Sequence, residues 1–253
     1  RHGPDNYENL DRHADAHVIV NTTPVGMYPN TGKAAVDLRQ FPQCAGVLDI
    51  VYNPARTALL LQAESLGIPC AGGLYMLVAQ AKRSCEVFTG TVIDDAQILR
   101  IHRLLRQEME NIVLIGMPGC GKSTVGAALA ALTGREAIDI DQRIEARAGC
   151  SIPEIFAQGG EAAFRALEQE ETALAGACSG KILLTGGGVV TVEANYASLH
   201  QNGRIYHLLR SLDTLATDGR PLSQGADLGA MWQRRAPLYA RFRDAEADNN
   251  GPA

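Results

Sequence analysis

Long apolar runs, paired cysteines and an excess of basic charge are all missing from this 253-residue sequence. No apolar stretch approaches the roughly 18 residues that a membrane-spanning helix needs. The net charge of −5 argues against a general affinity for nucleic acid or for an anionic membrane surface. Six cysteines are present, but none forms a C-x-x-C pair or stands at a zinc-finger spacing from a histidine. We therefore expect reduced thiols and a cytoplasmic protein that binds neither nucleic acid nor membrane.

The chain does contain ample material for folded α/β structure. Hydrophobic residues make up 46% of the sequence and charged residues 20%, which is typical of a packed core rather than of extended disorder. Short apolar runs alternate with helical patterns, and this predicts parallel strands joined by crossover helices. We expect two units, residues 1–108 and 109–253, with Met109 at the start of the second. The opening Arg1-His2-Gly3-Pro4 has neither an initiator Met nor a signal-peptide pattern, so this end resembles the edge of a fragment.

The same patterns predict individual elements. Strands are expected at residues 18–20, 47–51, 112–115, 137–140, 182–184 and 205–208, with a weaker candidate at 245–247. Helices are expected at residues 57–65, 74–87, 94–107 and 125–132, and another is expected to begin at Gly160-Glu161. Ligands of parallel sheets bind beyond the carboxyl ends of the strands, so motifs at those ends are the most informative.

The most specific motif is a glycine-rich loop between the predicted strand 112–115 and the predicted helix 125–132. Residues 116–124 read GMPGCGKST and match G-x-x-x-x-G-K-[ST] in the strand–loop–helix context of a nucleotide phosphate loop. Glycines let backbone N–H groups converge on a phosphate, and the helix N-terminus adds positive potential. Lys122 supplies a mobile charge for the β- and γ-phosphates, and Ser123 offers a hydroxyl to Mg²⁺. The alternative is a plain strand-to-helix turn whose lysine is solvated. The alignment of strand, loop and helix favours the phosphate loop over this alternative.

Two carboxylates, Asp139 and Asp141, follow the next predicted strand. Strand alternation places both on one side, at a carboxyl end beside the phosphate loop. There one can hold the water shell of the metal while the other accepts a hydrogen bond from an acceptor hydroxyl. Alternatively, Asp141 only caps a helix over residues 142–147, but a cap needs one carboxylate and not two.

Glycines and arginines further along the chain are informative only in combination. Thr185-Gly186-Gly187-Gly188 follows a buried strand and offers backbone that a small substrate could touch, although an ordinary turn has the same pattern. A guanidinium can clamp a carboxylate or neutralise charge on a transferring phosphoryl group, but a single arginine is more often a surface residue. The candidates are Arg165, Arg220, Arg234 and Arg235.

In this order the motifs resemble the shikimate kinase family. The resemblance covers residues 109 to about 248 and rests on the phosphate loop, Asp139-x-Asp141, Phe164-Arg165, the three glycines, Arg220-Pro221-Leu222 and RRAPLY at 234–239. It implies an α/β P-loop fold, with a parallel sheet, helices on both faces and a mobile lid. It also implies a transferase that phosphorylates the 3-hydroxyl of shikimate with ATP and Mg²⁺, in aromatic amino acid biosynthesis.

The resemblance implies roles for individual residues as well. Asp141 would hold and orient the shikimate hydroxyl, Asp139 and Ser123 would support Mg²⁺, and Arg220 on the lid would swing toward the phosphates. Lys122, Asp141 and Arg220 would therefore be the catalytic residues. ATP would be bound by Gly119, Gly121, Lys122, Ser123 and Thr124. Shikimate would be held by Asp141, Arg165, Gly187, Gly188 and Arg235.

Two departures from the family pattern bear on these roles. The stretch 210–218 is shorter than usual and Arg210 is its only basic residue, so the lid is expected to be abbreviated and adenine recognition is left open. The sequence stops at residues 249–253, where the family continues into a closing helix. Without that helix, part of one sheet face would be exposed.

Two other functions stay open at this point. One is a different small-molecule P-loop kinase, of gluconate or nucleoside-monophosphate type, against which the paired arginines argue. The other is a P-loop regulatory module without transferase activity, against which the paired aspartates and the lack of an N-K-x-D guanine motif argue.

Three turns in the first unit combine small and polar residues at strand ends or helix starts. They are residues 21–27, 49–54 and 72–81. Each alone would be an ordinary turn between the strands and helices of an α/β protein. In this order, from about Ala14 to Asp94, they resemble the C-terminal part of the Rossmann-like cofactor domain of shikimate dehydrogenase. The resemblance implies that Gln80 reaches the shikimate ring. It also implies that the nicotinamide side of NADP(H) is bordered by Thr22, Met27, Tyr52, Gly73 and Met76.

The rest of that family's pattern is not found in residues 1–108. The substrate domain with its catalytic Lys and Asp is absent, and no G-x-G-x-x-G turn occurs to hold a pyrophosphate. We therefore expect no tight NADP(H) binding and no dehydrogenase activity from this chain. We interpret it as a fragment of a dehydrogenase–kinase fusion that catalyses consecutive steps of one pathway.

Overall fold

The computed structural model describes residues 6–215 and 228–251. The chain divides into two compact units, Arg1–Gln107 and Glu108–Ala253, and the boundary falls within helix α3 (Ala96–Met109). Among the described residues, no helix is long and apolar enough to cross a bilayer. All six cysteines are free, as expected from the sequence.

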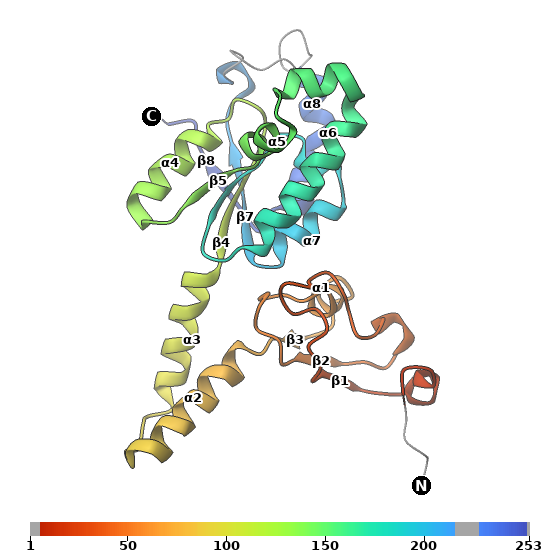
Figure 1. The fold of residues 1–253 in the computed structure, drawn as a ribbon, viewed down its shortest axis with the longest axis vertical. Helices are drawn as coiled ribbons and strands as arrows, with labels where there is room; N and C mark the ends of the chain where they lie inside the picture. The colour runs from red at the N-terminus through yellow and green to blue at the C-terminus, as the bar shows by residue number, and fades with distance from the viewer. Residues whose placement is uncertain (1–5, 216–227, 252–253) are drawn as a thin grey trace. The chain divides into compact units, whose positions relative to one another are not determined.

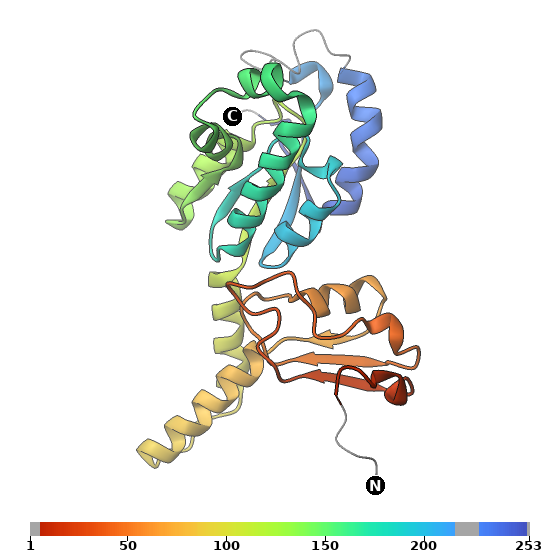
Figure 2. The same ribbon diagram turned by 45° about the vertical axis from the view of Figure 1, so that its right-hand side comes forward.

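A three-stranded parallel sheet forms the centre of the N-terminal unit. Its strands run side by side in the order β1 (Val18–Asn21), β2 (Gly46–Asp49) and β3 (Cys70–Ala71) (Figure 2). Helix α1 (Ala58–Ser65) covers one face of the sheet, and its apolar residues pack with Val47 and Leu38. Because side chains alternate along a strand, the opposite face carries Val18, Val20 and Leu48, each about half exposed.

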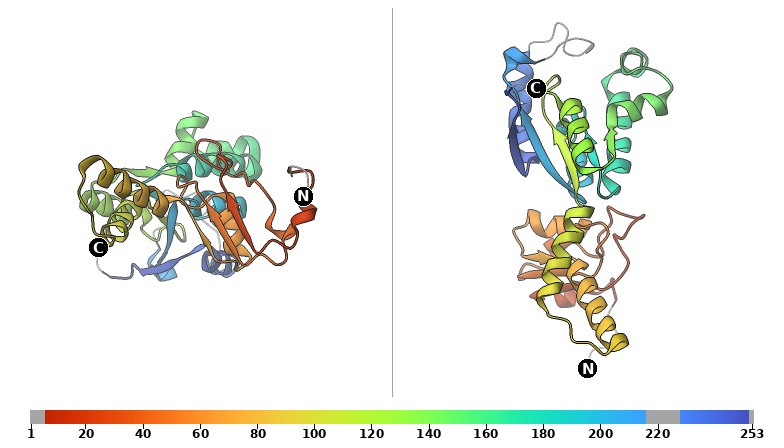
Figure 3. Two further views of the ribbon diagram at one scale, coloured as in Figure 1. Left: turned by 90° about the horizontal axis from the view of Figure 1, so that it is seen from below. Right: turned by 90° about the vertical axis from the view of Figure 1, so that its left-hand side faces the viewer.

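The two long helices of this unit, α2 (Leu74–Thr89) and α3, occur close to their predicted positions and lie side by side (Figure 3). The ring of Tyr75 contacts that of His102 at 5.9 Å between centroids, and Lys82 Nζ pairs with Asp95 Oδ1 at 2.6 Å. Helix α2 ends at Gly90, whose φ of 68° is the left-handed conformation that favours glycine.

Buried hydrogen bonds tie the carboxyl ends of β1 and β2 together. Asn21 Nδ2 donates to Asp49 Oδ1 at 3.0 Å, and Thr57 Oγ1 donates to Asp49 Oδ2 at 2.7 Å. Both carboxylate oxygens of Asp49 therefore have protein partners, so this buried acid is satisfied without a ligand. The same network places Thr57 as the N-cap of α1, one residue before the helix begins.

The C-terminal unit contains a five-stranded sheet in which every pairing is parallel (Figure 1). Its central strands are the most apolar segments of the chain and are almost fully buried. All five strands predicted for this unit are present, including the weak candidate at the C-terminal edge. Their order is β5 (Ala137–Asp139), β6 (Ile182–Leu184), β4 (Asn111–Ile115), β7 (Gly203–Leu209) and β8 (Ala245–Asp248).

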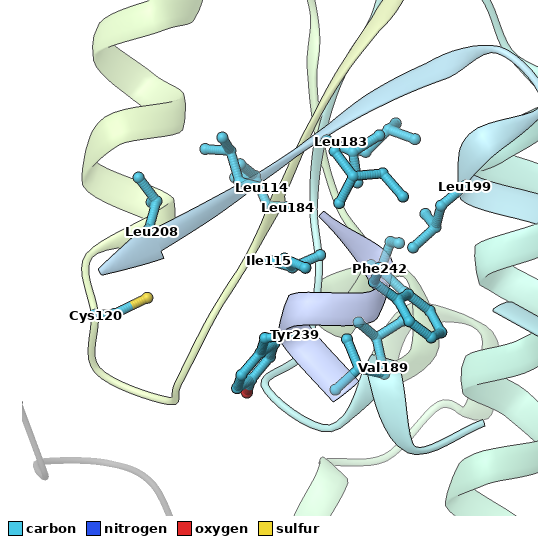
Figure 4. Close-up of a cluster of buried hydrophobic side chains, with 14 of the residues drawn as sticks. Leu114, Ile115, Cys120, Leu183, Leu184, Val189, Leu199, Leu208, Tyr239 and Phe242 are labelled. Carbon is cyan, nitrogen blue, oxygen red and sulfur yellow. The ribbon is translucent and has the colours of Figure 1, made fainter. Parts of the chain in front are cut away.

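Helices cover both faces of this sheet, as expected. The register pairs Leu114 with Leu184, and Leu184 packs against Gly126 of α4 (Lys122–Thr133). On the other side of β4, Ile115 is paired with His207 of β7. The ring of His207 stacks on that of Tyr239 in α8 (Leu228–Phe242), with 4.7 Å between the ring centroids. Figure 4 shows the apolar side chains of these two layers, with Leu114 and Leu208 on the side of α4. Helix α7 (Ala194–His200) lies on the α8 side, against β7.

The start of α5 (Ile140–Ala148) corrects one prediction. Strand β5 ends at Asp139, which caps the helix by accepting hydrogen bonds from the N–H groups of Asp141 and Gln142. Asp141 therefore lies in the first turn of a helix and not on a strand, so the argument from strand alternation was wrong. The capping residue is Asp139 rather than Asp141 because a cap precedes the first helical residue by one position.

Helix α6 (Ile152–Ala177) begins earlier than predicted. Its first turn has a capping box in which Ser151 and Glu154 satisfy each other's backbone groups. Gly160, with φ 68° and ψ −171°, interrupts the helix and divides it into two pieces that run in different directions (Figure 2). The start predicted at Gly160-Glu161 is thus the start of the second piece.

Strand β3 and helices α7 and α8 had no counterpart among the predicted elements. The remaining elements are short 3₁₀ turns: η1 (Leu10–His13), η2 (Leu38–Gln40), η3 (Val189–Thr191) and η4 (Leu212–Thr214).

A close helix–helix contact in the C-terminal unit generates a stability prediction. A Cβ built on Gly176 of α6 would overlap the backbone carbonyl of Ser198 in α7. Gly176→Ala should lower the free energy of unfolding by about 1–3 kcal/mol, because overpacking outweighs the gain in helix propensity. Denaturant unfolding followed by the fluorescence of Trp232 reports on this unit alone, since Trp232 is the only tryptophan.

The matched control is Ala173→Ser, an exposed position on the same helix, which should change the unfolding free energy by less than about 0.5 kcal/mol. A Gly176→Ala protein at least as stable as the wild type would contradict the packing described.

Candidate active site

A cavity of about 430 Å³ lies at the carboxyl ends of β4, β5 and β6. This is the edge at which parallel sheets bind their ligands. The cavity brings together ten of the residues predicted from the sequence. They are Gly119, Gly121, Lys122, Ser123, Asp139, Asp141, Arg165, Gly187, Gly188 and Arg235.

The phosphate loop follows β4 and leads directly into α4. Gly116, Gly119 and Gly121 have φ values of 147°, 84° and 97°, a left-handed backbone that other residues rarely adopt. Lys122 Nζ donates to the carbonyl oxygens of Gly116 at 2.8 Å and Met117 at 3.1 Å. The ammonium group is thereby held over the loop, at the positive end of α4.

Asn249 supports this loop, and the sequence analysis had not assigned it a role. Its Nδ2 donates to the carbonyl oxygen of Cys120 at 2.7 Å, and a Cβ on Gly121 would approach that nitrogen to 2.6 Å. Asn249 directly follows β8, so the edge strand of the sheet positions the loop. The contact joins residues 129 positions apart, and no local pattern could have indicated it.

The two aspartates have different environments. Asp139 Oδ1 is occupied by the cap of α5, whereas Asp141 Oδ1 is buried without a hydrogen-bond partner. Burial raises the pKa of Asp141 to about 6, and the neighbouring charge of Asp139 adds to the rise. A carboxylate with this pKa is suited to accept a proton near neutral pH.

The glycine turn after β6 packs against the charged groups of the cavity. A Cβ on Gly186 would lie 2.8 Å from Asp141 Oδ1, and a Cβ on Gly187 would lie 2.6 Å from the Pro118 ring. A Cβ on Gly188 would overlap the guanidinium of Arg165. A side chain at Gly187 would therefore meet the ring and backbone nitrogen of Pro118, whereas one at Gly186 or Gly188 would displace the ends of charged side chains that line the cavity.

Two of the candidate arginines lie at the cavity and a third does not. Arg165 comes from the second piece of α6 and is largely buried, and Arg235 comes from α8. Arg235 Nη1 donates to the carbonyl oxygen of Gly187 at 3.1 Å, and Tyr239 Oη donates to the same oxygen at 2.5 Å. Arg234 is exposed, because neighbouring residues on a helix point about 100° apart.

Glu168 is a further charged residue of the cavity that the sequence analysis missed. It is fully buried and accepts a hydrogen bond from Arg165 Nη1 at 2.6 Å through Oε2, while its Oε1 has no partner. Burial raises the pKa of Glu168, and the charge of Arg165 opposes that rise. Its spacing of three residues from Arg165 on a helix was the available signal.

Apolar side chains also line the cavity. The rings of Phe156 and Phe164 stack at 4.9 Å between centroids, and Ile152, Pro153 and Met231 complete the surface. The cavity thus combines an apolar lining with a few convergent cationic and acidic groups, as small-molecule sites usually do.

Not every predicted residue is placed at this cavity. Thr124 is exposed on α4, and Arg220 lies outside the described residues. In the N-terminal unit Gly73 is buried, and a Cβ there would overlap the carbonyl of Ile50. The other residues proposed to border NADP(H) or to reach the ring are exposed: Thr22, Met27, Tyr52, Met76 and Gln80.

Among residues 6–215 and 228–251 no group of three or more His, Cys, Asp or Glu side chains is arranged to hold a metal ion. Mg²⁺ usually binds through one or two protein oxygens together with substrate phosphates and water. Ser123 and Asp139, which both line the cavity beside the phosphate loop, fit that mode of binding.

Comparisons with known proteins agree with this geometry. The family model "Shikimate kinase" matches residues 118–253. A shikimate kinase of Pseudomonas putida (strain F1) is 39% identical over 155 residues, which cover 57% of this chain and 90% of that protein. A shikimate kinase of Synechococcus sp. (strain RCC307) is 40% identical over 146 residues, which cover 54% of this chain and 74% of that protein.

Solved structures give similar results. The shikimate kinase of Acinetobacter baumannii in complex with shikimate has a TM-score of 0.54 and 33% identity, and covers 59% of this chain and 89% of that one. The N-terminal part is similar to shikimate dehydrogenase 1 of Peptoclostridium difficile, at 39% identity with a TM-score of 0.37. That match covers 39% of this chain and 36% of the dehydrogenase.

The raised pKa of Asp141 generates a prediction about stability. The pKa of this carboxyl is 3.8 in the unfolded chain and about 6 in the folded protein. The cost of ionising it in the folded state therefore grows as the pH rises from 4 to 6 and stays at its full value at higher pH. Asp141→Asn should therefore raise the free energy of unfolding by about 2–3 kcal/mol at pH 8 and by almost nothing below pH 4.

Unfolding followed by Trp232 fluorescence at several pH values measures this difference. Glu170→Gln, which removes an exposed carboxylate of α6 paired with Arg147, serves as the control and should show no such pH dependence. A destabilised Asp141→Asn protein at pH 8 would show that the buried charge does not oppose folding.

Proposed function

The chain belongs to the shikimate kinase family, and from this premise we propose how its residues carry out ATP-dependent phosphorylation of the shikimate 3-hydroxyl. The observation that supports the assignment is the convergence of four kinds of group in one cavity. These are a phosphate loop with its lysine, a carboxylate of raised pKa, two arginines and a glycine turn.

ATP and Mg²⁺ fit the residues at the phosphate-loop end of the cavity. The glycines with positive φ leave the N–H groups of the loop accessible to an anion. Lys122 Nζ donates to backbone carbonyl oxygens, and a phosphate oxygen would replace them as its hydrogen-bond acceptor. Gly119, Gly121, Lys122 and the first turn of α4, with Ser123 and Thr124, would hold the phosphates. Ser123 and Asp139 would support Mg²⁺, which neutralises charge on the phosphates when it is bound.

Shikimate fits the other end of the cavity. Its carboxylate would lie between the guanidiniums of Arg165 and Arg235, and its ring would lie against the backbone of Gly187 and Gly188. The Acinetobacter baumannii shikimate kinase, which is 33% identical to this chain, was solved in complex with shikimate, and this supports the same ligand here. The hydroxyl to be phosphorylated would point to Asp141.

The reaction follows from these positions. Asp141 accepts the proton of the acceptor hydroxyl as the oxygen forms a bond to the γ-phosphorus, and the bond from that phosphorus to the β,γ-bridging oxygen breaks to release ADP. Lys122 and the loop N–H groups stabilise the charge that develops on the phosphoryl oxygens. Arg220 is proposed to add to this stabilisation from the lid.

For the N-terminal unit we keep the interpretation as part of a dehydrogenase cofactor domain. Residues 21–27 and 49–54 lie at the carboxyl ends of β1 and β2, which is where a dinucleotide would be expected. We propose that this unit alone binds NADP(H) weakly and does not oxidise shikimate. We also propose that the chain acts in the cytoplasm, where its six free thiols stay reduced.

Turnover of shikimate is the direct test of the proposed reaction. Release of ADP from ATP should depend on shikimate, and Lys122→Ala should reduce kcat by at least about 100-fold because a transition-state charge partner is lost. Glu170→Gln is the control and should retain wild-type turnover. Faster turnover with gluconate or a nucleoside monophosphate than with shikimate would overturn the proposal.

The pH dependence of the same reaction tests the role of Asp141. Because the base must be ionised, kcat/KM should decrease as the pH is lowered below about 6. Asp141→Asn should abolish this decrease at low pH and should reduce the rate by about 100-fold or more. An unchanged inflection in Asp141→Asn would assign the proton transfer to another group.

A further inference from the structure

Arg165 is held by two carboxylates that differ in environment. Glu168 is fully buried and bonds Nη1 at 2.6 Å. Glu161 is 69% exposed, and its Oε1 accepts hydrogen bonds from Nε at 3.2 Å and Nη2 at 3.1 Å. The guanidinium is therefore satisfied on both sides in the absence of any acceptor.

The two contacts are not equivalent for a ligand. A carboxylate pairs best with two parallel N–H donors, and the Nε–Nη2 edge of Arg165 is the one that the buried Glu168 does not occupy. An acceptor carboxylate that uses this edge must first displace Glu161. Removal of Glu168 would leave a buried cation unpaired, whereas Glu161 can turn into water at little cost.

The backbone before Glu161 is compatible with such a movement. Gly160 interrupts α6, so Glu161 belongs to the first turn of the second helical piece and its predecessor has no side chain. A Cβ built on Gly160 meets nothing within 4 Å. Glu161 thus has open space beside it, while Arg165 is fixed by Glu168 and the glycine turn.

We propose that Glu161 is a specificity-determining residue that occupies the acceptor-binding edge of Arg165 until the carboxylate of the acceptor replaces it. This inference rests on the proposed function of the cavity. Acceptors whose carboxylate reaches both Arg165 and Arg235 outcompete one exposed glutamate. An uncharged polyol leaves the Glu161–Arg165 pair intact and gains nothing from Arg165.

The test compares steady-state kinetics of the full chain with shikimate and with its neutral carboxamide. Glu161→Gln should lower KM for shikimate by about two- to five-fold, the range expected for an exposed ion pair of up to about 1 kcal/mol. The value of kcat should stay unchanged, since Glu161 does not touch the reacting atoms. KM for the carboxamide should also stay unchanged. Glu170→Gln, on the same helix, should alter neither substrate.

A second variant separates the contact from a long-range effect of charge. Glu161→Gln combined with Ala162→Glu keeps the net charge of the helix but moves the carboxylate about 100° around it, away from Arg165. The low KM should persist in this double variant. A return to the wild-type KM, or a raised KM in Glu161→Gln, would overturn the proposal. Absence of shikimate turnover in the wild type would instead overturn the proposed function.

Discussion

The site depends on how closely one stretch of backbone can approach a set of charged side chains. The turn Gly186–Gly188 passes within contact distance of Asp141, Pro118 and Arg165, and a Cβ at any of the three positions would force one of these neighbours to shift. The carbonyl of Gly187 is in turn held by Arg235 and Tyr239 from α8. This turn therefore links the acid of α5, the arginine of α6 and the arginine of α8, and fixes the shape of the cavity.

The charges around this turn are not arranged for the greatest stability of the fold. Asp141 and Glu168 both have a buried carboxylate oxygen without a partner, and burial raises the pKa of each. Unsatisfied buried oxygens cost folding free energy, which the largely apolar core beneath the loop has to offset. An acceptor hydroxyl at Asp141 would remove part of this cost, so substrate binding and relief of the unfavourable burial would occur together.

Local patterns in the sequence predicted the sheet and the phosphate loop because both depend on neighbouring residues. The apolar runs of β4 and β6 are each short continuous segments, and the glycines before Lys122 all lie between Gly116 and Gly121. The position of Asp141 was wrong because strand and helix compete at residues 139–141, and the cap formed by Asp139 decides in favour of the helix. Asn249 could not be found, since its partner lies 129 residues away. Tyr239 belongs to the RRAPLY motif, but its contact with Gly187, 52 residues away, could not be predicted. The first piece of α6 was missed because Gly159-Gly160 suggested the start of a helix rather than an interruption.

The proposed function requires the guanidiniums of Arg165 and Arg235 to bind the carboxylate of the acceptor together. Equilibrium binding of shikimate to wild type and to Arg235→Lys, followed by the fluorescence of Trp232 on the same helix as Arg235, tests it most directly. Lysine keeps the charge but cannot offer two parallel donors, so affinity should fall by about 10- to 100-fold, as expected for loss of a charge-assisted hydrogen bond. Equal affinity in the two proteins would mean that Arg235 does not bind the carboxylate of shikimate.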